Sequence, residues 1–392
     1  MDLEKVYNLN CTFTVYLGAK SQMQPSKPKI TWKMLLFPLL GIVGFLLYIY
    51  LFNVNIIGIL ATAKKANPII YSVAILFGLF QVLFFTVSWR VLANHLSIKM
   101  TIVRAYLYVW YGMYVDTIVP AQSISGEITR TYLLTRDKCG PFGKVVASLY
   151  THRILGTAIN AVALLAGVVL LTFGGNVNPL VFNLIIIVAA VILTMVILMT
   201  VLSFKPQWTT GVVNWGTKVA EKISRGKFNL DKYKDETVEI IGHFHYSMNE
   251  FRHKPRAVAY SVLYLLASWF FSLSIPFLVF ISLGHPVSIS VILVTSAIFL
   301  AVKSIPVGIP FEVGLPEAVM TTLYISMGVP GALAVTATVL TRLITLWLFF
   351  VIGFGAQQWL ELKPAIPSNT NTEKTKINPA VIIQRLQDGN KN

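Results

Sequence analysis

Long runs of apolar residues dominate the chain, and short polar or charged stretches separate them. A helix of about 20 apolar residues crosses a hydrocarbon core of ~30 Å, whereas transmembrane β-strands alternate apolar and polar residues over about ten positions. The runs in this chain do not alternate in that way. The pattern therefore predicts an all-α polytopic membrane protein with about six full spans, at residues 34–52, 69–89, 142–173, 180–204, 257–283 and 331–360.

Two further apolar runs are interrupted by proline, glycine and polar residues, which break a continuous helix. Residues 102–119 lead into Pro120, and the apolar piece that follows, 128–135, rises only about 12 Å as a helix. Residues 287–305 are followed in the same way by 318–327. We expect two re-entrant helical hairpins, near 102–137 and 287–328. A full crossing by 102–119 is the alternative, since this run is long enough.

The charges between the runs predict how the chain is oriented. Basic residues concentrate in the tail before the first span and in the loop 90–104, whereas the turns 174–179 and 284–286 contain no Lys, Arg, Asp or Glu. Because Lys and Arg favour the cytoplasmic side, both termini are predicted to be cytoplasmic. The first hairpin then enters from the cytoplasm and the second from outside, so the two units form an inverted repeat, as in many transporters.

The chain accordingly divides into two membrane halves, flanked by polar tails and joined by a polar insertion. In the insertion, apolar residues three to four apart on either side of a basic linker indicate two amphipathic helices. In chain order the parts are a basic cytoplasmic tail, the first half, the cytoplasmic helix pair, the second half and a disordered cytoplasmic tail, at residues 1–33, 34–204, 205–256, 257–362 and 363–392.

Composition and charge limit the function. The chain is 55% hydrophobic and 12% charged, with a net charge of +16. In a membrane protein such a charge is explained by basic cytoplasmic loops and attraction to anionic lipid, and no nucleic-acid-binding fold surrounds it, so a nucleic-acid partner is not expected. The two cysteines are too few for a disulfide framework or a cysteine-based metal site, and no P-loop string for ATP is present. We expect neither cofactor nor metal.

Glutamate and arginine recur at matching places in the two interrupted regions. Glu127 and Glu317 each follow a proline by seven residues, and an arginine close after a threonine lies further on in each region: Arg153 follows Thr151 by two residues, and Arg342 follows Thr341 directly. An ionised side chain near the bilayer centre costs roughly 2.5–3.5 kcal/mol, so four of them would cost on the order of 10 kcal/mol if left unpaired. The four are therefore predicted to pair or to face a wet cavity.

The first region contains the groups of an anion site. Ser125, or Ser123, is placed to cap a half-helix that begins near Gly126, and the free N–H groups of that helix end would point into the membrane interior. Arg153 and Arg130 are expected nearby. Phosphate is the expected guest, because helix-end N–H groups and guanidinium groups both match its oxygens.

The second region repeats these features with Arg342. The alternative is purely structural: Glu127 pairs with Arg153, and Glu317 or Glu312 pairs with Arg342, only to hold the hairpins against the spans. Both interpretations stay open, because a carboxylate that neutralises an arginine in the empty protein can be displaced by a lipid phosphate.

His152 is a further ionisable residue in the predicted interior. Intramembrane histidines generally face polar interiors, so we interpret it as a neutral histidine that lines a polar cavity, with proton coupling as the alternative. His243 and His245 are two residues apart and would point to different faces of a helix, which does not suit a metal site.

These stretches resemble the lysylphosphatidylglycerol synthase transmembrane-region family, a flippase-like membrane module that in some bacteria precedes a soluble aminoacyl-transferase domain. The resemblance implies lipid movement between leaflets, in the cytoplasmic membrane of a prokaryote. At Phe311-Glu312-Val313 the chain departs from the family's Pro-Gly-Gly-x-Gly pattern, and no soluble transferase domain is expected after Leu362. The resembling residues are Pro120, Gly126, Glu127, Arg130, Ala147, Ser148, Arg153, Pro310, Gly314, Glu317, Gly328 and Arg342.

The combined expectation is a lipid flippase that moves an anionic, aminoacylated or glycosylated phospholipid, and is not a synthase on its own. The rivals are a membrane-embedded lipid-phosphate transferase, with Glu127 or Glu317 as general base, and a non-transporting scaffold for a separate transferase. Expected partners are membrane lipids, with a separate transferase and a second copy of the chain as further candidates. The predicted translocation residues are Ser125, Gly126, Glu127, Arg130, His152, Arg153, Glu312, Glu317 and Arg342.

Overall fold

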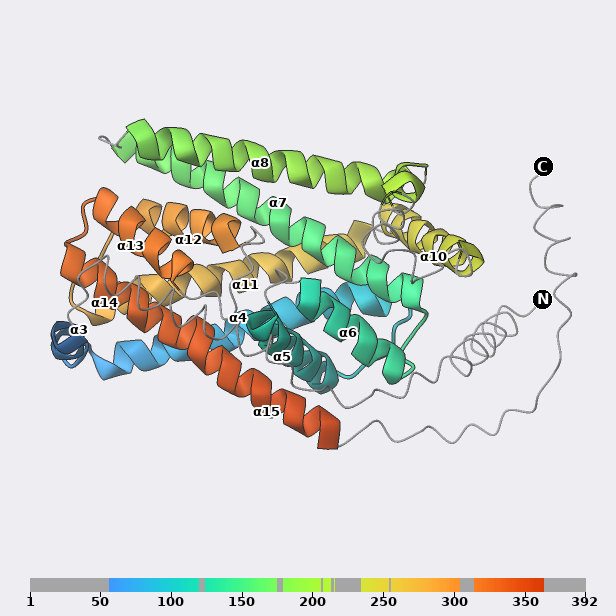
Figure 1. Ribbon diagram of the computed structural model, residues 1–392, viewed down its shortest axis with the longest axis horizontal. Helices are drawn as coiled ribbons and strands as arrows, with labels where there is room; N and C mark the ends of the chain where they lie inside the picture. Colours follow the sequence, from blue (N-terminus) through green and yellow to red (C-terminus); the bar gives the residue numbers. More distant parts are fainter. Residues whose placement is uncertain are drawn as a thin grey trace, which may run out of the picture.

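The computed structural model describes residues 56–119, 124–174, 179–205, 207–212, 215, 234–253, 255–303 and 314–362. Every regular element in these ranges is helical, which confirms the predicted all-α class (Figure 1). The predicted span 34–52, both tails, the proline at 120 and Glu312 lie outside the described residues. The helices are α3 Ile56–Ala63, α4 Pro68–His95, α5 Ile102–Ile118, α6 Ile124–Arg136, α7 Phe142–Gly174, α8 Pro179–Phe204, α10 Lys234–His253, α11 Pro255–Ser282, α12 Ile289–Lys303, α13 Leu315–Ser326, α14 Gly331–Arg342, the π-helical segment η3 Leu343–Leu348, and α15 Phe349–Leu362.

Four of the described stretches are long and apolar enough to cross a membrane, and they make this a multi-pass membrane protein. They are Pro68–His95, Ile186–Phe204, Pro255–Ser282 and the continuous stretch Gly331–Leu362. Each falls in a region where a full span was predicted. Residues 142–173 form one 33-residue helix, α7, while a full crossing by this helix and the total of six spans stay predictions.

Short polar signals fix where several helices begin. The side chain of Asn67 accepts hydrogen bonds from the N–H groups of Ile69 and Ile70 and so caps α4, and Pro68 occupies the first helical position. Thr101 caps α5 by accepting from the N–H of Arg104. These caps set the starts of the two helices that lead into the first interrupted region.

The central contact of the bundle is between α4 and α11, which pack along their length. The hydroxyl of Ser88 on α4 donates to the carbonyl of Ser261 on α11, and that of Ser268 donates back to the carbonyl of Gln81. Around α4 and α11, the two hairpins make matching contacts with long helices. The first arm of one hairpin, α5, packs on α15, and the first arm of the other, α12, packs on α7. The second arms, α6 and α13, are each followed along the chain by a long helical stretch, α7 in one case and α14 to α15 in the other.

The two hairpins open at opposite ends of the molecule. The N–H of Lys99, before α5, donates to the carbonyl of Cys139, after α6, so the α5–α6 hairpin begins and ends where α4 ends. The N–H of Asn67, at the start of α4, donates to the carbonyl of Ser282 at the end of α11, so α12 begins at the other end. In Figure 1 the two hairpins accordingly lie toward the right and left ends of the bundle.

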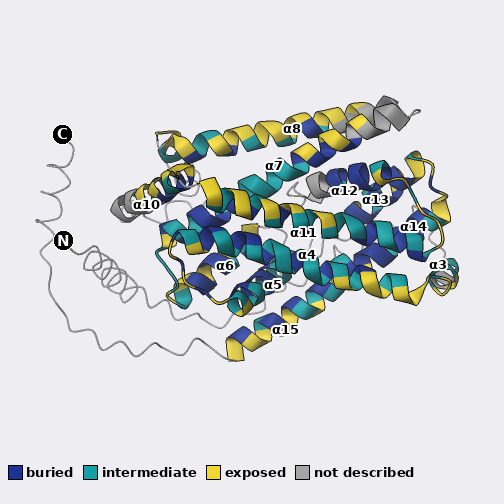
Figure 2. Cartoon of the chain, turned by 180° about the vertical axis from the view of Figure 1, so that it is seen from behind, coloured by how far each residue is buried: buried dark blue, intermediate teal, exposed yellow. Residues whose placement is uncertain are grey.

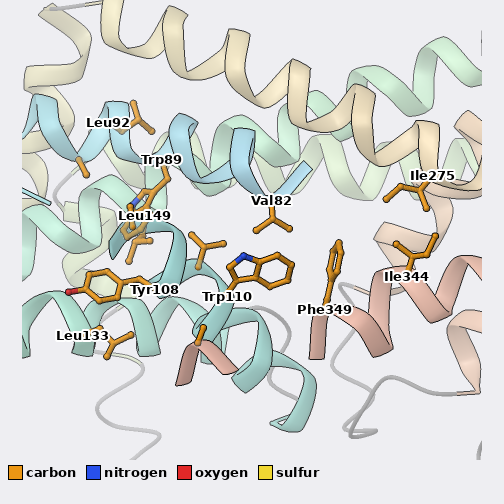
Figure 3. Close-up of a cluster of buried hydrophobic side chains, with 14 of the residues drawn as sticks. Val82, Trp89, Leu92, Tyr108, Trp110, Leu133, Leu149, Ile275, Ile344 and Phe349 are labelled. Carbon is orange, nitrogen blue, oxygen red and sulfur yellow. The ribbon is translucent and has the colours of Figure 1, made fainter. Parts of the chain in front are cut away.

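Large aromatic side chains fill the core between the two halves. Trp89, Tyr108 and Trp110 are fully buried, and the ring of Trp110 meets that of Phe349 edge-on at 5.1 Å between centroids (Figure 3). The outer faces are apolar but exposed, as along α8 (Figure 2). Exposed apolar residues over a whole helix face suit contact with lipid tails.

The polar insertion is partly described. Its second predicted amphipathic helix is confirmed as α10, which buries Phe244, Met248 and Phe251 and packs on α7. Of its first predicted helix the structure describes residues 207–212 and 215, where Trp208 and Trp215 are exposed.

Candidate functional site

A cluster of two acids and two bases lies where α5, α6 and α7 meet. Within it, Nη1 of Arg153 on α7 is 3.0 Å from Oε1 of Glu127 in the first turn of α6. Each of these side chains keeps 23% of its surface exposed. The structure thus shows the predicted pairing of Glu127 with Arg153, in a place that solvent or a ligand still reaches.

Asp116 is the acid that sequence reasoning missed. It lies near the end of α5, and its Oδ1 accepts a hydrogen bond from the N–H of Gly126 and another from the hydroxyl of Ser125, both at 2.6 Å. Helix α6 begins at Ile124, so Ser125 lies inside the helix, and the prediction that it caps the helix is wrong. The other predicted cap, Ser123, lies outside the described residues. The N–H that was expected to be free for a ligand is bound by the protein's own carboxylate. The signal in the sequence was a single acid in the run 102–119.

Two glycines allow this contact between α5 and α6. A Cβ on Gly126 would lie 2.7 Å from the carbonyl oxygen of Gly112 and would overlap the Asp116 carboxylate. A Cβ on Gly112 would lie 3.0 Å from the carbonyl oxygen of Gly126. The hairpin therefore closes by direct backbone approach, which brings Asp116 to the start of α6.

Arg130 lies one turn further along α6 and is almost fully buried, with 7% of its surface exposed. Its Nε donates to the carbonyl of Gly126 at 3.4 Å, and its guanidinium carbon lies 5.3 Å from the ring centroid of Trp89 and 5.8 Å from that of Phe85. The Nη1 atom has no hydrogen-bond partner among the described residues. A buried guanidinium with an unused donor is costly, and an anionic ligand would satisfy it.

His152 precedes Arg153 on α7 but faces a different neighbour. Its ring is buried and meets the ring of Phe85 edge-on, with 4.5 Å between centroids. Its Nε2 atom has no hydrogen-bond partner within the described part of the chain. The structure therefore places His152 in the aromatic packing around Phe85, next to the acid–base cluster.

The second region contains an equivalent glutamate–arginine pair that is more deeply buried. Nε of Arg342, at the end of α14, donates to Oε1 of Glu317, and the two side chains expose only 5% and 4% of their surface. Oε2 of Glu317 accepts from the N–H of Gly314 at 2.6 Å, which closes the start of α13. Gly314 has φ of 100°, a conformation that favours glycine. The arginine also lies over the ring of Phe299, 5.6 Å from its centroid.

The two pairs stand at the same depth, measured from opposite ends. Arg153 lies eleven residues after the first residue of α7, and Arg342 lies eleven residues after the first residue of α14, which is about 16 Å along each helix. Glu127 and Glu317 each lie nine residues before the end of their own half-helix. Both regions therefore bring a carboxylate and a guanidinium together well inside the bundle.

A polar network closes the end of the molecule where the first hairpin opens. Asp137, after α6, accepts hydrogen bonds from the Tyr108 hydroxyl and from Nε of Arg136, the latter at 3.2 Å. Nη1 of Arg136 also donates to Oε1 of Glu361 at 3.4 Å, and Glu361 is near the end of α15. This network ties the first hairpin to the last helix of the second half.

The chemistry of the site is that of ion pairing. In the described part of the chain no three His, Cys, Asp or Glu side chains stand close enough to hold a metal ion. The groups available are carboxylates, guanidinium groups, a hydroxyl and helix-end N–H donors, the set that recognises phosphate oxygens and ammonium groups.

Comparison with known proteins gives a family and several archaeal relatives. Residues 36–353 match the family model described as lysylphosphatidylglycerol synthase TM region. A UPF0104 membrane protein of Pyrococcus horikoshii is 27% identical over 285 residues, which cover 71% of this chain and 84% of that protein. UPF0104 membrane proteins of Methanothermobacter thermautotrophicus and Methanocaldococcus jannaschii are 22% and 23% identical, over 75% and 74% of this chain and 86% and 85% of theirs.

Proposed function

The chain belongs to the lysylphosphatidylglycerol synthase TM region family, and on that premise we propose that it is a lipid flippase. It moves a phospholipid with an anionic, aminoacylated or glycosylated head group between leaflets. The observation that carries the proposal is the partly exposed pair of Glu127 and Arg153, with Arg130 beside it, at the start of a half-helix deep in the bundle. Intramembrane ionisable residues of this kind mark substrate paths.

The arrangement of the two halves supports a transport cycle. Hairpins that open at opposite ends, with reciprocal packing around α4 and α11, are what an inverted repeat produces. In this proposal both hairpins are re-entrant, and the halves rock against each other so that the head-group site faces one leaflet and then the other. The acyl chains stay in the bilayer, along the exposed apolar faces of the bundle.

The head group binds through its phosphate. Arg153 exchanges its carboxylate partner Glu127 for a phosphate oxygen, and Arg130 supplies the unused Nη1 donor. Guanidinium groups suit this role because they remain charged and donate to two oxygens in one plane. Glu127 is then available for an ammonium group, where the head group has one.

The test is a lipid-movement assay in proteoliposomes. Purified protein is reconstituted into phosphatidylcholine vesicles that contain a trace of fluorescent phosphatidylglycerol or phosphatidylcholine, and an impermeant reductant bleaches the label in the outer leaflet. The expected result is bleaching of inner-leaflet label only when the protein is present. We expect transport to be driven by an ion gradient or to need no energy source, so the assay is run with and without a proton gradient.

Matched arginine variants separate a site from a general effect of charge. Arg153→Ala is expected to abolish movement, while Arg256→Ala, at an exposed position in the first turn of α11, retains it. Equal activity of both variants would overturn the phosphate site.

A protein that moves no lipid under any gradient would instead favour the two rival functions, which differ in a second experiment. Purified protein that modifies a lipid in the presence of an activated donor is a transferase. Protein that only retains a separate transferase at the membrane is a scaffold.

A further inference from the structure

Asp116 occupies the position that an anionic ligand would take in the proposed site. Its carboxylate accepts the N–H of Gly126 in the first turn of α6 and the hydroxyl of Ser125. Backbone N–H groups at a helix start are the donors that phosphate uses. A lipid phosphate that reaches this helix end must therefore replace the carboxylate or share its donors.

A second observation shows that this helix end is built for an anion. Arg130, one turn along α6, is 93% buried and has an Nη1 atom without a hydrogen-bond partner among the described residues. Its charge interacts with Asp116, Glu127 and Arg153. The site thus has an unused cationic donor beside a carboxylate that binds the helix end.

The charges of the four side chains at this site cancel. Two carboxylates, Asp116 and Glu127, face two guanidinium groups, Arg130 and Arg153. A phosphodiester head group without a cation of its own adds one negative charge. An uncompensated charge in a buried site costs several kcal/mol, so the loaded site requires one more positive charge or one fewer carboxylate.

We infer that Asp116 takes up one proton for each monoanionic phosphodiester head group that binds, and that the protein therefore couples such lipids to protons. The proton converts the carboxylate to a neutral carboxyl group, which leaves the helix end to the phosphate and keeps the net charge of the site at zero. Release of the lipid in the other leaflet returns the proton to water on that side. This inference rests on the proposed function.

The surroundings of Asp116 leave few other groups to take the proton. On α6 it faces Glu127 and Arg130, and α7 adds Arg153 and His152. Helix α15 packs on α5 and contributes Glu361, which is held by Arg136 and Tyr111 at the far end of the helix. On α4, Arg90 is turned toward the carbonyl of Met100. The rivals for the proton are Glu127 and His152, and variants distinguish them.

The experiment measures protons taken up on lipid binding. Detergent-solubilised full-length protein is titrated calorimetrically with a short-chain phosphatidylglycerol in two buffers of different ionisation enthalpy at the same pH. The wild type is expected to take up about one proton per lipid, with affinity that weakens as pH rises, by up to about tenfold per pH unit. Asp116→Asn is expected to bind with no proton uptake and with little dependence on pH.

Controls and contrary outcomes are distinct. Glu250→Gln, on α10, is the control and is expected to keep the proton uptake of the wild type. Uptake that persists in Asp116→Asn and disappears in Glu127→Gln or His152→Gln would overturn the assignment.

The inference and the proposed function fail differently. Lipid binding by the wild type without proton uptake overturns the inference alone, whereas no binding of any lipid overturns both. Should Asp116→Asn not fold, the proton count of the wild type still decides the stoichiometry, and vesicle assays with an imposed pH gradient, in which inward and outward gradients must give opposite lipid distributions, decide the coupling.

Discussion

The two glutamate–arginine pairs have the same chemistry but different surroundings. Glu127 and Arg153 meet at 3.0 Å and are each 23% exposed, with a further acid and a further base beside them. Glu317 and Arg342 are at most 5% exposed, and both oxygens of Glu317 are used, one by the arginine and one by the N–H of Gly314. In the proposed function the first pair exchanges partners with the lipid, whereas the second pair holds α13 against α14.

The two glutamate–arginine pairs also differ in burial, and burial determines how much an ion pair matters to stability. Removing one partner of a buried ion pair leaves an uncompensated charge and costs about 3–5 kcal/mol, whereas an exposed pair contributes about 0–1 kcal/mol. Phe299 covers Arg342, whereas Glu127 and Arg153 each keep 23% of their surface exposed. The proposed function requires this exposure, because a ligand has to reach Arg153.

The largest effect is expected from breaking the buried pair. Arg342→Leu should lower the free energy of unfolding by about 3–5 kcal/mol, because Glu317 is left charged and dry. Unfolding in detergent, followed by circular dichroism, measures the loss, and the double change Glu317→Leu with Arg342→Leu should recover much of it. A stable Arg342→Leu protein that no longer moves lipid would mean that this pair also binds substrate.

The next effect is on transport and concerns the open pair. Arg153→Ala should slow lipid movement by at least about tenfold, and its loss of unfolding free energy should stay below that of Arg342→Leu, because Glu127 keeps contact with solvent and with the charge of Arg130. The vesicle bleaching assay and the detergent unfolding assay measure the two quantities on one preparation. A large loss of stability with normal transport would reverse the roles assigned to the two pairs.

A smaller effect is expected from separating α5 and α6. Gly126→Ala inserts a methyl group 2.7 Å from the carbonyl oxygen of Gly112, and overpacking of this kind costs about 1–3 kcal/mol. Gly156→Ala, on α7, is the matched control, because its Cβ meets nothing within 4 Å. Equal stability of the two variants would show that the hairpin does not depend on the close approach.

The smallest effect is expected at the surface network that joins the halves. Glu361→Gln removes the partner of Arg136 at 3.4 Å, but Glu361 is 47% exposed, so the change in unfolding free energy should stay below about 1 kcal/mol. The difference from wild type should shrink further in high salt. A loss as large as that of Arg342→Leu would show that this network, and not the buried pair, fastens the halves.

Most of the difference between the two glutamate–arginine pairs could not be predicted from the sequence. The hydrophobic pattern predicted the helices of both hairpins to within a few residues. The repeated Glu and Arg predicted the pairing of Glu127 with Arg153, and left Glu317 or Glu312 as the partner of Arg342. Which pair is dry depends on how Phe299 and α12 pack, which periodicity does not encode. Asp116 was missed because its partner, the start of α6, lies ten residues on and meets it only through the approach of Gly112 and Gly126.

The π-helical segment Leu343–Leu348 follows Arg342 directly and separates α14 from α15. Wide turns of this kind bend more readily than regular helix, and they recur at functional sites. On the N-terminal side of this segment, α14 is held to α13 by the buried pair of Glu317 and Arg342. On its C-terminal side, α15 packs on α5 of the first hairpin. The π-helical segment thus interrupts the last described helical stretch, whereas its counterpart α7 is one continuous α-helix. We expect the π-helical segment to act as a hinge, so that α15 moves with the first hairpin while Glu317 and Arg342 remain paired.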